Sequence, residues 1–232
     1  MTVLNDVTLT ATAGTVTALV GESGCGKSMI ARTLIGLPPA GVTVSGTIHL
    51  GGHRLNPSRT TGWSAVRGHH IGYIPQSVSG AFTVSHTIGR QLDQVCRTLT
   101  ADRTPTELAA AAGLAADALT CWPHQLSGGM LQRAAIAAAI AGRPTVVVAD
   151  EPTSALDPDL ADHTWRLLGD LASDGAAVVV ITHDMRSLHA SDLVDDVLVM
   201  RNGTLIEQTT PAALANHPDQ YIAAFGKAPA WN

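Results

Sequence analysis

The sequence predicts an α/β fold with a mainly parallel β-sheet at its core, and three observations lead to this prediction. Apolar runs at residues 15–20, 145–149 and 176–182 could be buried on both faces, and they alternate with segments of helical spacing. The alanine-rich residues 77–142 predict an α-helical subdomain inserted into the sheet domain. A chain of 232 residues with 45% hydrophobic side chains is long enough to bury the core of one large domain or two small lobes.

The elements of the first half follow from local patterns. Residues 3–11 alternate between apolar and polar side chains and predict a strand, and residues 43–50 predict another. Together they indicate a small N-terminal β lobe. Between them, residues 28–37 predict a helix that stops at Gly36 and the proline pair that follows. Residues 70–75 predict one more short strand.

The second half continues the alternation of strands and helices. Residues 160–172 predict a helix between the last two apolar strands, and residues 194–207 predict a hairpin that turns at Asn202 and Gly203. We expect a single domain over residues 1–232, with a core at about residues 1–76 and 143–208, a helical subdomain at about 77–142 and a C-terminal tail at about 209–232.

The composition argues against a nucleic-acid partner. Charged residues make up 14% of the chain, against about 25% in an average domain, and the net charge is −5. A protein that binds nucleic acid through its phosphates needs a basic surface instead. Four Trp, two Tyr and two Phe are also too few for a surface that stacks on bases. We therefore expect no nucleic acid among the ligands.

The cysteines and the lengths of the apolar runs argue against a disulfide-bonded protein and against a membrane-spanning one. Cys25, Cys96 and Cys121 show neither paired CxxC spacing nor a disulfide framework, which is typical of reduced thiols. The longest uncharged apolar runs, residues 134–141 and 176–181, are much shorter than the roughly 18 residues that span a membrane. We expect a soluble chain without a targeting segment, so that any membrane role comes through a partner.

A glycine-rich loop joins the strand at residues 15–20 to the helix that follows it. The loop matches G-x-x-x-x-G-K-[ST] in this strand–helix context, and its glycines allow backbone N–H groups to turn inward around an anion. Lys27 would contact the β- and γ-phosphates of a nucleotide, and Ser28 would contact Mg²⁺. The alternative is an ordinary turn with a solvent-facing lysine. The residues of the motif are Gly21, Glu22, Ser23, Gly24, Cys25, Gly26, Lys27 and Ser28, with Met29 next in the helix.

Two adjacent acids, Asp150 and Glu151, end the apolar strand at residues 145–149. At the carboxyl end of a parallel strand, side chains lie at the edge of the sheet where ligands usually bind. Asp150 would hold the Mg²⁺ shell, and Glu151 could polarise a water molecule. The alternative is a pair of solvated acids in a turn.

Together with four further motifs, these residues resemble the nucleotide-binding subunit of an ABC (ATP-binding cassette) transporter. Gln76 ends a predicted strand, at the place of the family's Q-loop glutamine. Residues 126–133 (LSGGMLQR) are similar to the family signature, Asp157 lies in a segment that resembles the D-loop, and His183 lies in an ITHD segment that resembles the switch histidine region. The motifs follow in the family's order over nearly the whole chain.

The resemblance implies a P-loop NTPase of the RecA-like class that hydrolyses ATP with Mg²⁺. It also implies that the signature contacts ATP on a second ATP-binding subunit, identical or paralogous, and that transmembrane permease subunits bind the pair. The implied catalytic residues are Glu151, His183, Gln76 and Lys27; the implied ligands of ATP are residues 21–29 with Ser127, Gly128, Gly129 and Asp157; the implied metal-binding residues are Ser28, Gln76 and Asp150.

Within the family, short similarities favour importers of dipeptides, oligopeptides or nickel. Met130 stands in the signature where glutamine is commoner in the family. Leu131 before Gln132 resembles the nickel-type ATPase at that position, and so does the tail that contains His217 and Pro218. This implies a peripheral protein at the cytoplasmic face of the membrane. It also implies a solute-binding protein as an indirect partner. The cargo stays open between peptides and nickel or metal chelates.

The chain also departs from the family pattern, and other functions need to be weighed. None of the residues before Gly21 is aromatic, whereas the family normally stacks an aromatic side chain on adenine there. No cysteine cluster follows the tail, so we expect no iron–sulfur centre. The alternatives are the ATPase subunit of an exporter, a soluble ABC ATPase without a transport role, and an inactive cassette. The presence of Lys27, Glu151 and His183 argues against the inactive cassette.

Overall fold

The computed structural model describes residues 2–78, 80–154 and 156–226. In the order of the main sheet, its strands are β4 (Ile71–Ile74), β5 (Val146–Asp150), β6 (Ala177–Ile181), β1 (Val16–Gly21), β7 (Asp196–Arg201) and β8 (Thr204–Thr209). Neighbouring strands are parallel from β4 to β7, and β8 pairs antiparallel with β7. The predicted α/β fold with a mainly parallel sheet is confirmed.

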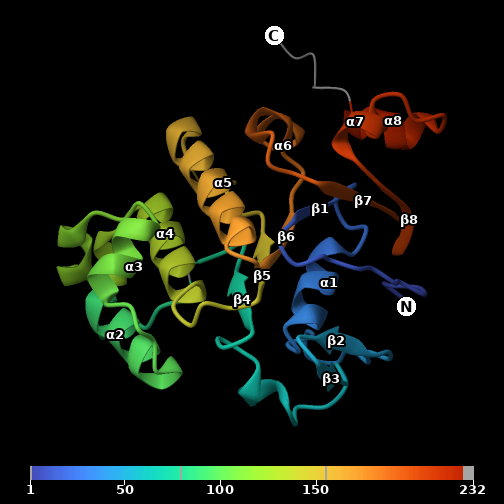
Figure 1. The fold of residues 1–232 in the computed structure, drawn as a ribbon. Coiled ribbons are helices and arrows are strands. Elements are labelled where there is room, and N and C mark those ends of the chain that lie inside the picture. Colours follow the sequence, from blue (N-terminus) through green and yellow to red (C-terminus); the bar gives the residue numbers. More distant parts are fainter. Residues whose placement is uncertain (1, 79, 155, 227–232) are drawn as a thin grey trace.

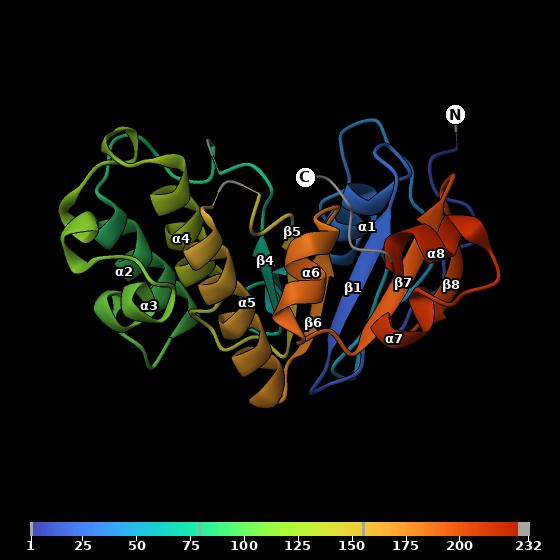
Figure 2. The ribbon, with the colours of Figure 1, turned by 90° about the horizontal axis from the view of Figure 1, so that it is seen from above.

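Helices cover both faces of this sheet, as Figures 1 and 2 show. They are α1 (Lys27–Leu34), α2 (Ile88–Leu99), α3 (Pro105–Ala111), α4 (Gly128–Ala139), α5 (Pro158–Ser173), α6 (Met185–Ser191), α7 (Pro211–Leu214) and α8 (Gln220–Gly226). Strands β2 (Ile48–Leu50) and β3 (His53–Leu55) form a separate antiparallel pair beside α1 (Figure 1). In the part of the chain that the structure describes, no helix is both long and apolar enough to cross a membrane.

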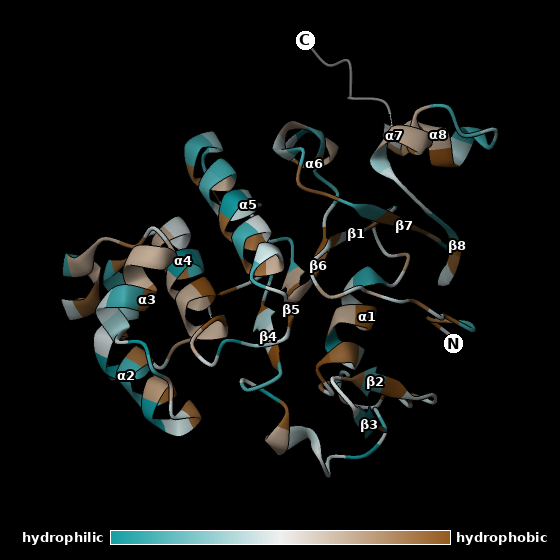
Figure 3. Ribbon diagram, in the orientation of Figure 1, coloured by the Kyte–Doolittle hydropathy of each residue, from teal (hydrophilic) through white to brown (hydrophobic). Residues whose placement is uncertain are grey.

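Side chains that alternate along the central strands divide the core into two clusters. On β1, Ala18 belongs to the cluster that contains Ile136 of α4, and the next residue, Leu19, belongs to the cluster that contains Ile30 of α1. The same alternation recurs on β5, β6 and β7. In Figure 3, hydrophobic residues follow β6 and β7 through the centre of the fold, and α5 carries many hydrophilic residues. Burial on both faces explains why these strands read as continuous apolar runs.

Helices α2, α3 and α4 form the helical lobe, and side-chain caps fix where each of them begins. Thr87 accepts a hydrogen bond from the Arg90 backbone N–H at the start of α2. Thr104 and Glu107 form a reciprocal capping box at the start of α3. Ser127 accepts from the Met130 N–H at the start of α4. Such caps satisfy N–H groups that have no partner within the helix, and each contributes about 1 kcal/mol.

The hairpin predicted at Asn202 and Gly203 is confirmed. Strands β7 and β8 pair up to that turn, where both residues have positive φ angles of 50° and 79°. An Asn-Gly pair tolerates this conformation at low cost, which is why it is a strong hairpin signal. The turn lies at the same end of the sheet as the glycine-rich loop, because β7 runs parallel to β1.

Two predicted elements of the N-terminal part need correction. Residues 3–11 form no strand, although Leu4, Val7 and Leu9 pack against the α1-side cluster. Their alternation therefore reflects packing on one side without a neighbouring strand to pair with. The strand expected at residues 43–50 is limited to β2, and the small β pair follows α1 in the chain.

The first helix is also shorter than predicted, and Gly36 shows why the chain turns there. Helix α1 ends at Leu34, and Gly36 has a φ angle of +66°. A Cβ atom at Gly36 would lie 2.2 Å from the ring of the buried Trp63. The turn thus needs glycine both for its backbone conformation and for the space that the indole ring fills.

Candidate functional site

The glycine-rich loop connects the end of β1 to the start of α1, and its shape depends on glycine. A Cβ at Gly21 would lie 2.5 Å from the Met200 carbonyl oxygen, and one at Gly26 would lie 2.7 Å from the Leu4 side chain. Gly26 also has a φ angle of 108° as the N-cap residue of α1. The loop is therefore held in a narrow space between β7 and the N-terminal segment, with the helix N-terminus at its mouth.

Lys27 is buried, and its ammonium group turns back onto the loop. The Nζ atom donates to the Gly21 carbonyl at 2.7 Å and to the Glu22 carbonyl at 3.0 Å, and it lies 3.9 Å from the Cys25 Sγ. Burying an ammonium group is costly unless acceptors surround it. A phosphate anion in the loop would be a stronger acceptor for this lysine than a neutral carbonyl.

Ser28 and Asp150 meet across the sheet edge, which brings the loop and the end of β5 together. The Ser28 hydroxyl donates to the Asp150 Oδ1 at 3.2 Å. Burial raises the pKa of Asp150, and the nearby Glu151 charge raises it further. The hydrogen bond from Ser28 and the charge of Lys27 act in the opposite direction. Burial and, secondarily, Asp150 raise the pKa of Tyr73 on β4 to about 12.

The oxygen atoms of Ser28 and Asp150 suit Mg²⁺ but do not by themselves enclose a metal ion. Among the residues at 2–78, 80–154 and 156–226, no group of three or more His, Cys, Asp or Glu side chains could hold one. Mg²⁺ prefers oxygen ligands and commonly binds through one or two protein groups together with phosphates and water. The residues present therefore fit a magnesium ion that arrives with a nucleotide.

Glu151 and His183 bring the ends of β5 and β6 together. The His183 Nδ1 lies 2.6 Å from the Glu151 Oε1, with the carboxylate buried and the imidazole largely exposed. Glu151 has a φ angle of 52°, and its N–H donates to the Ile181 carbonyl at 2.8 Å. A non-glycine residue in this conformation costs about 1–3 kcal/mol, and such strain is concentrated at functional sites.

Gln76 lies at the same edge, because it follows β4, which pairs in parallel with β5. Its side chain is exposed. The residue before it, Pro75, accepts a hydrogen bond at 3.3 Å from the buried amide of Gln132 on α4. Sequence reasoning missed Gln132 as a link between the helical lobe and Gln76, since nothing in the local pattern connects residues so far apart.

The signature residues lie at the start of α4, which packs on the face of the sheet opposite α1 (Figures 1 and 2). Ser127 caps α4, and Gly128 and Gly129 form its first turn. Asp157 caps α5 by accepting from the Leu160 N–H at 3.1 Å. Ala155, within the predicted D-loop segment, lies outside the described residues. The fold thus brings Lys27, Ser28, Asp150, Glu151 and His183 to one edge of the sheet. The signature begins a helix that packs on the face of the sheet opposite α1.

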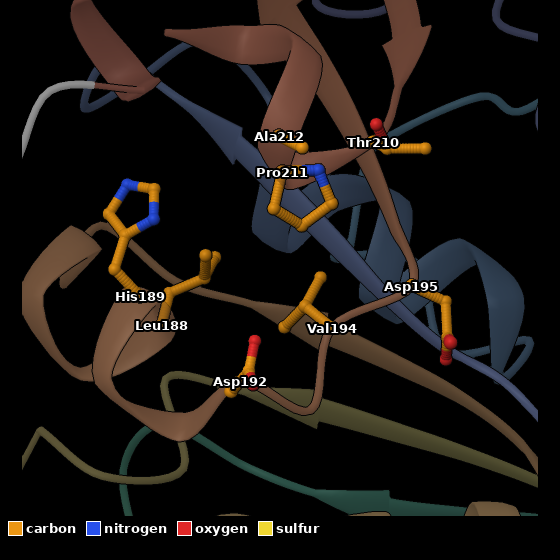
Figure 4. A pocket seen from close by; sticks show the side chains of 8 residues that line it. All are labelled: Leu188, His189, Asp192, Val194, Asp195, Thr210, Pro211 and Ala212. Atoms are coloured by element: carbon orange, nitrogen blue, oxygen red, sulfur yellow. The ribbon is translucent and has the colours of Figure 1, made fainter.

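A cavity of about 470 Å³ lies away from these residues, between α6, the start of β7 and the start of α7 (Figure 4). Its lining includes His189, Asp192 and Asp195, and Asp195 accepts from the Val16 N–H at the amino end of β1. The glycine-rich loop is at the carboxyl end of that strand. Ligands of parallel sheets bind at the carboxyl ends, so the arrangement of charged groups there, and not this cavity, defines the candidate site.

The fold and the site define a phosphate-loop ATPase with a helical lobe, and comparison with known proteins gives its family. Residues 4–154 match the ABC transporter family, and the chain belongs to that family as an ATP-hydrolysing ATP-binding domain. It is 34% identical to the metal-staphylopine import system ATP-binding protein CntD of Staphylococcus aureus (strain NCTC 8325 / PS 47), over 96% of this chain and 84% of that protein.

Two further comparisons agree with this assignment. The chain is 36% identical to the uncharacterized ABC transporter ATP-binding protein YejF of Escherichia coli (strain K12), over 94% of this chain and 43% of that longer protein. The dimeric structure of the ATP-binding cassette MJ0796 in a post-hydrolysis state, bound to ADP and Pi, matches with a TM-score of 0.79. That match has 25% identity and covers 90% of each chain.

Proposed function

We propose that the chain is the ATP-binding subunit of an ABC importer, and that it hydrolyses ATP at the carboxyl edge of β1, β5 and β6. The observation that carries the proposal is the convergence of two contacts, Ser28 with Asp150 and Glu151 with His183, beside the buried Lys27. Lys27 and the loop N–H groups bind the phosphates, and Glu151 orients the attacking water as a general base. His183 holds Glu151 and faces the γ-phosphate.

The remaining sequence-predicted ligands take supporting roles in this proposal. Ser28 and Asp150, with Gln76, would hold Mg²⁺, which would neutralise negative charge on the phosphates. Backbone groups of residues 21–29 surround the phosphates. Because Lys27 already has two carbonyl acceptors, nucleotide binding has to replace those two hydrogen bonds with bonds to phosphate oxygens.

We propose that a second cassette completes the site through Ser127, Gly128, Gly129 and Asp157. These residues start α4 and α5, whose N–H groups and partial positive charge suit an anion. Helix α4 packs on the face of the sheet opposite α1, and in our proposal another chain supplies the signature that contacts this phosphate loop. The related MJ0796 structure is a dimer, which supports this arrangement.

For the cargo, we propose import of a metal chelate or a peptide. One relative serves metal-staphylopine import, and another, 36% identical over 88% of this chain and 39% of its own length, is the peptidoglycan transport ATP-binding protein YejF of Agrobacterium fabrum (strain C58 / ATCC 33970). Cells that lack this chain should lose uptake of either a radiolabelled nickel chelate or a labelled peptide. Unchanged uptake of both, alongside loss of an exported compound, would instead indicate an exporter.

The segment between Gln76 and α2 is the proposed docking site for transmembrane permease subunits at the cytoplasmic face of the membrane. Val84 is 73% exposed there, and Phe82 is partly buried against the cluster that contains α4. This packing favours a core role for Phe82 and leaves Val84 as the apolar contact for a permease helix.

The two side chains should therefore respond differently to substitution. Val84→Asp should leave the isolated subunit folded, with unchanged basal ATP hydrolysis, and should abolish the stimulation by permease. Phe82→Ala should lower the free energy of unfolding by about 1–3 kcal/mol, less than full burial would give. Thermal melting and ATPase assays with and without permease measure both effects. Normal permease stimulation in Val84→Asp would contradict the docking proposal.

A further inference from the structure

The rear of the phosphate loop rests on the β7–β8 hairpin. Met200 is the register partner of Gly21 in the sheet. The Gly203 N–H, at the hairpin turn, donates to the Cys25 carbonyl at 3.1 Å. Gly21 and Cys25 of the loop are thus both in contact with one hairpin.

The C-terminal helix α8 reaches this support through Tyr221. The Tyr221 hydroxyl donates to the Met200 carbonyl at 3.0 Å, next to a register shift between Val199 and Met200 that interrupts the pairing of β7 with β8. A bulge of this kind locally disrupts the ladder of backbone hydrogen bonds. The tyrosine therefore supplies a hydrogen-bond donor to the strand end that adjoins Gly21.

The ring of Tyr221 is fixed in this position from two directions. The Arg201 guanidinium lies 4.7 Å from the ring centroid, and the Phe225 ring packs edge-on at 5.3 Å. Burial raises the pKa of Tyr221; the Glu22 backbone opposes this rise, and the charges of Glu22 and Cys25 add to it. The tyrosine therefore shares its surroundings with the phosphate loop itself.

The hairpin contacts become more important for the shape of the loop when a nucleotide binds. Without phosphate, Lys27 ties the loop together by donating to the Gly21 and Glu22 carbonyls. Once its ammonium group turns to phosphate, those two bonds are lost to the loop. The contacts from Gly203 to Cys25 and from Tyr221 to Met200 do not involve Lys27, so they can hold the loop in shape in both states.

We propose that Tyr221 is a positioning residue for nucleotide binding, which couples the C-terminal helix α8 to the phosphate loop through Met200. The inference rests on the proposed ATP site at Lys27. It assigns to the tail a role that the sequence motifs do not contain: the tail preorganises the loop without touching the nucleotide. Because preorganisation acts on binding, the effect falls on affinity and not on the chemical step.

Tyr221→Phe removes the hydroxyl alone and tests the coupling. A net hydrogen bond of about 0.5–1.5 kcal/mol converts to roughly a 2- to 12-fold change, so we expect the Kd for MgADP and the KM for ATP to rise by about that factor. The kcat at saturating ATP should stay within about twofold of the wild type, because no group at the reacting phosphate changes. Calorimetric titration and steady-state assays give the three values.

Ile222→Val is the matched control on the same helix. Ile222 is buried, and loss of one methylene loosens α8 while the hydroxyl contact stays. The control should lower the melting temperature and leave the Kd unchanged. The proposal is overturned if Tyr221→Phe binds MgADP as the wild type does, or if Ile222→Val weakens binding equally. Lys27→Met distinguishes failure of the Tyr221 proposal from failure of the proposed ATP site. Wild-type affinity for MgADP in Lys27→Met would overturn the ATP site as well.

Discussion

Glu151→Gln should lower the rate of ATP hydrolysis by 10²-fold or more, on the usual scale for a positioned general base, while ATP still binds. The amide has the shape of the carboxylate and can still contact His183, which lies 2.6 Å from Glu151 in the structure. It cannot accept a proton from the attacking water. Phosphate release under single-turnover conditions and equilibrium ATP binding measure the two parts of this expectation separately.

A control acid distinguishes loss of the base from loss of one negative charge. Glu207 is on β8 and lies 3.5 Å from His217, away from β5 and β6. Glu207→Gln should hydrolyse ATP at the wild-type rate. A Glu151→Gln variant with near-normal turnover would show that another group activates the water.

Lys27→Met should lower kcat/KM for ATP by about 10²- to 10³-fold, the scale for removal of one donor that stabilises charge at the reacting group. Methionine is apolar and unbranched, so the buried stem is largely replaced while the ammonium group is lost. The variant also leaves the Gly21 and Glu22 carbonyls without the hydrogen bonds that Lys27 donates to them. Because nucleotide binding would replace those bonds in the wild type, it is the loss of the ammonium group that should reduce nucleotide binding, measured by titration with MgADP.

Arg32→Met is the matched control for Lys27. Arg32 is exposed in the last turn of the same helix, and its charge lowers the pKa of Asp150 as a minor contribution. Its removal takes one positive charge from α1 without a change in the phosphate loop. Binding and turnover within about threefold of the wild type are expected, on the scale of a screened surface charge. Equal losses in the two variants would mean that long-range charge alone accounts for the effect.

Much of this architecture could be predicted because the relevant signals are local. Apolar runs marked β1, β5 and β6, and the Asn202-Gly203 pair marked the hairpin. The residues of the candidate site that lie together also come from local motifs at strand ends, since parallel strands place their carboxyl ends at one edge. Their roles in binding and hydrolysis stay predictions that the substitutions above test.

What could not be predicted depends on contacts between distant parts of the chain. Alternation at residues 3–11 resembled a strand, yet only the folded context shows that no neighbouring strand pairs with it. Gln132 lay within the predicted signature segment and Tyr221 within the predicted C-terminal tail, and neither carried a predicted role of its own. Their importance comes from hydrogen bonds to Met200 and Pro75, far away in sequence, which no motif encodes.

The most direct test of a nucleotide site shared between two cassettes is the molar mass of Glu151→Gln by light scattering, with and without MgATP. Slow hydrolysis should trap the bound state, so the mass should rise from one chain to two when ATP is added. Adding Ser127→Arg to the same chain should prevent the rise, because the signature would no longer accommodate the partner's phosphate. A chain that binds ATP stoichiometrically, stays at the mass of one chain and hydrolyses ATP at a rate independent of Ser127 would contradict the shared site.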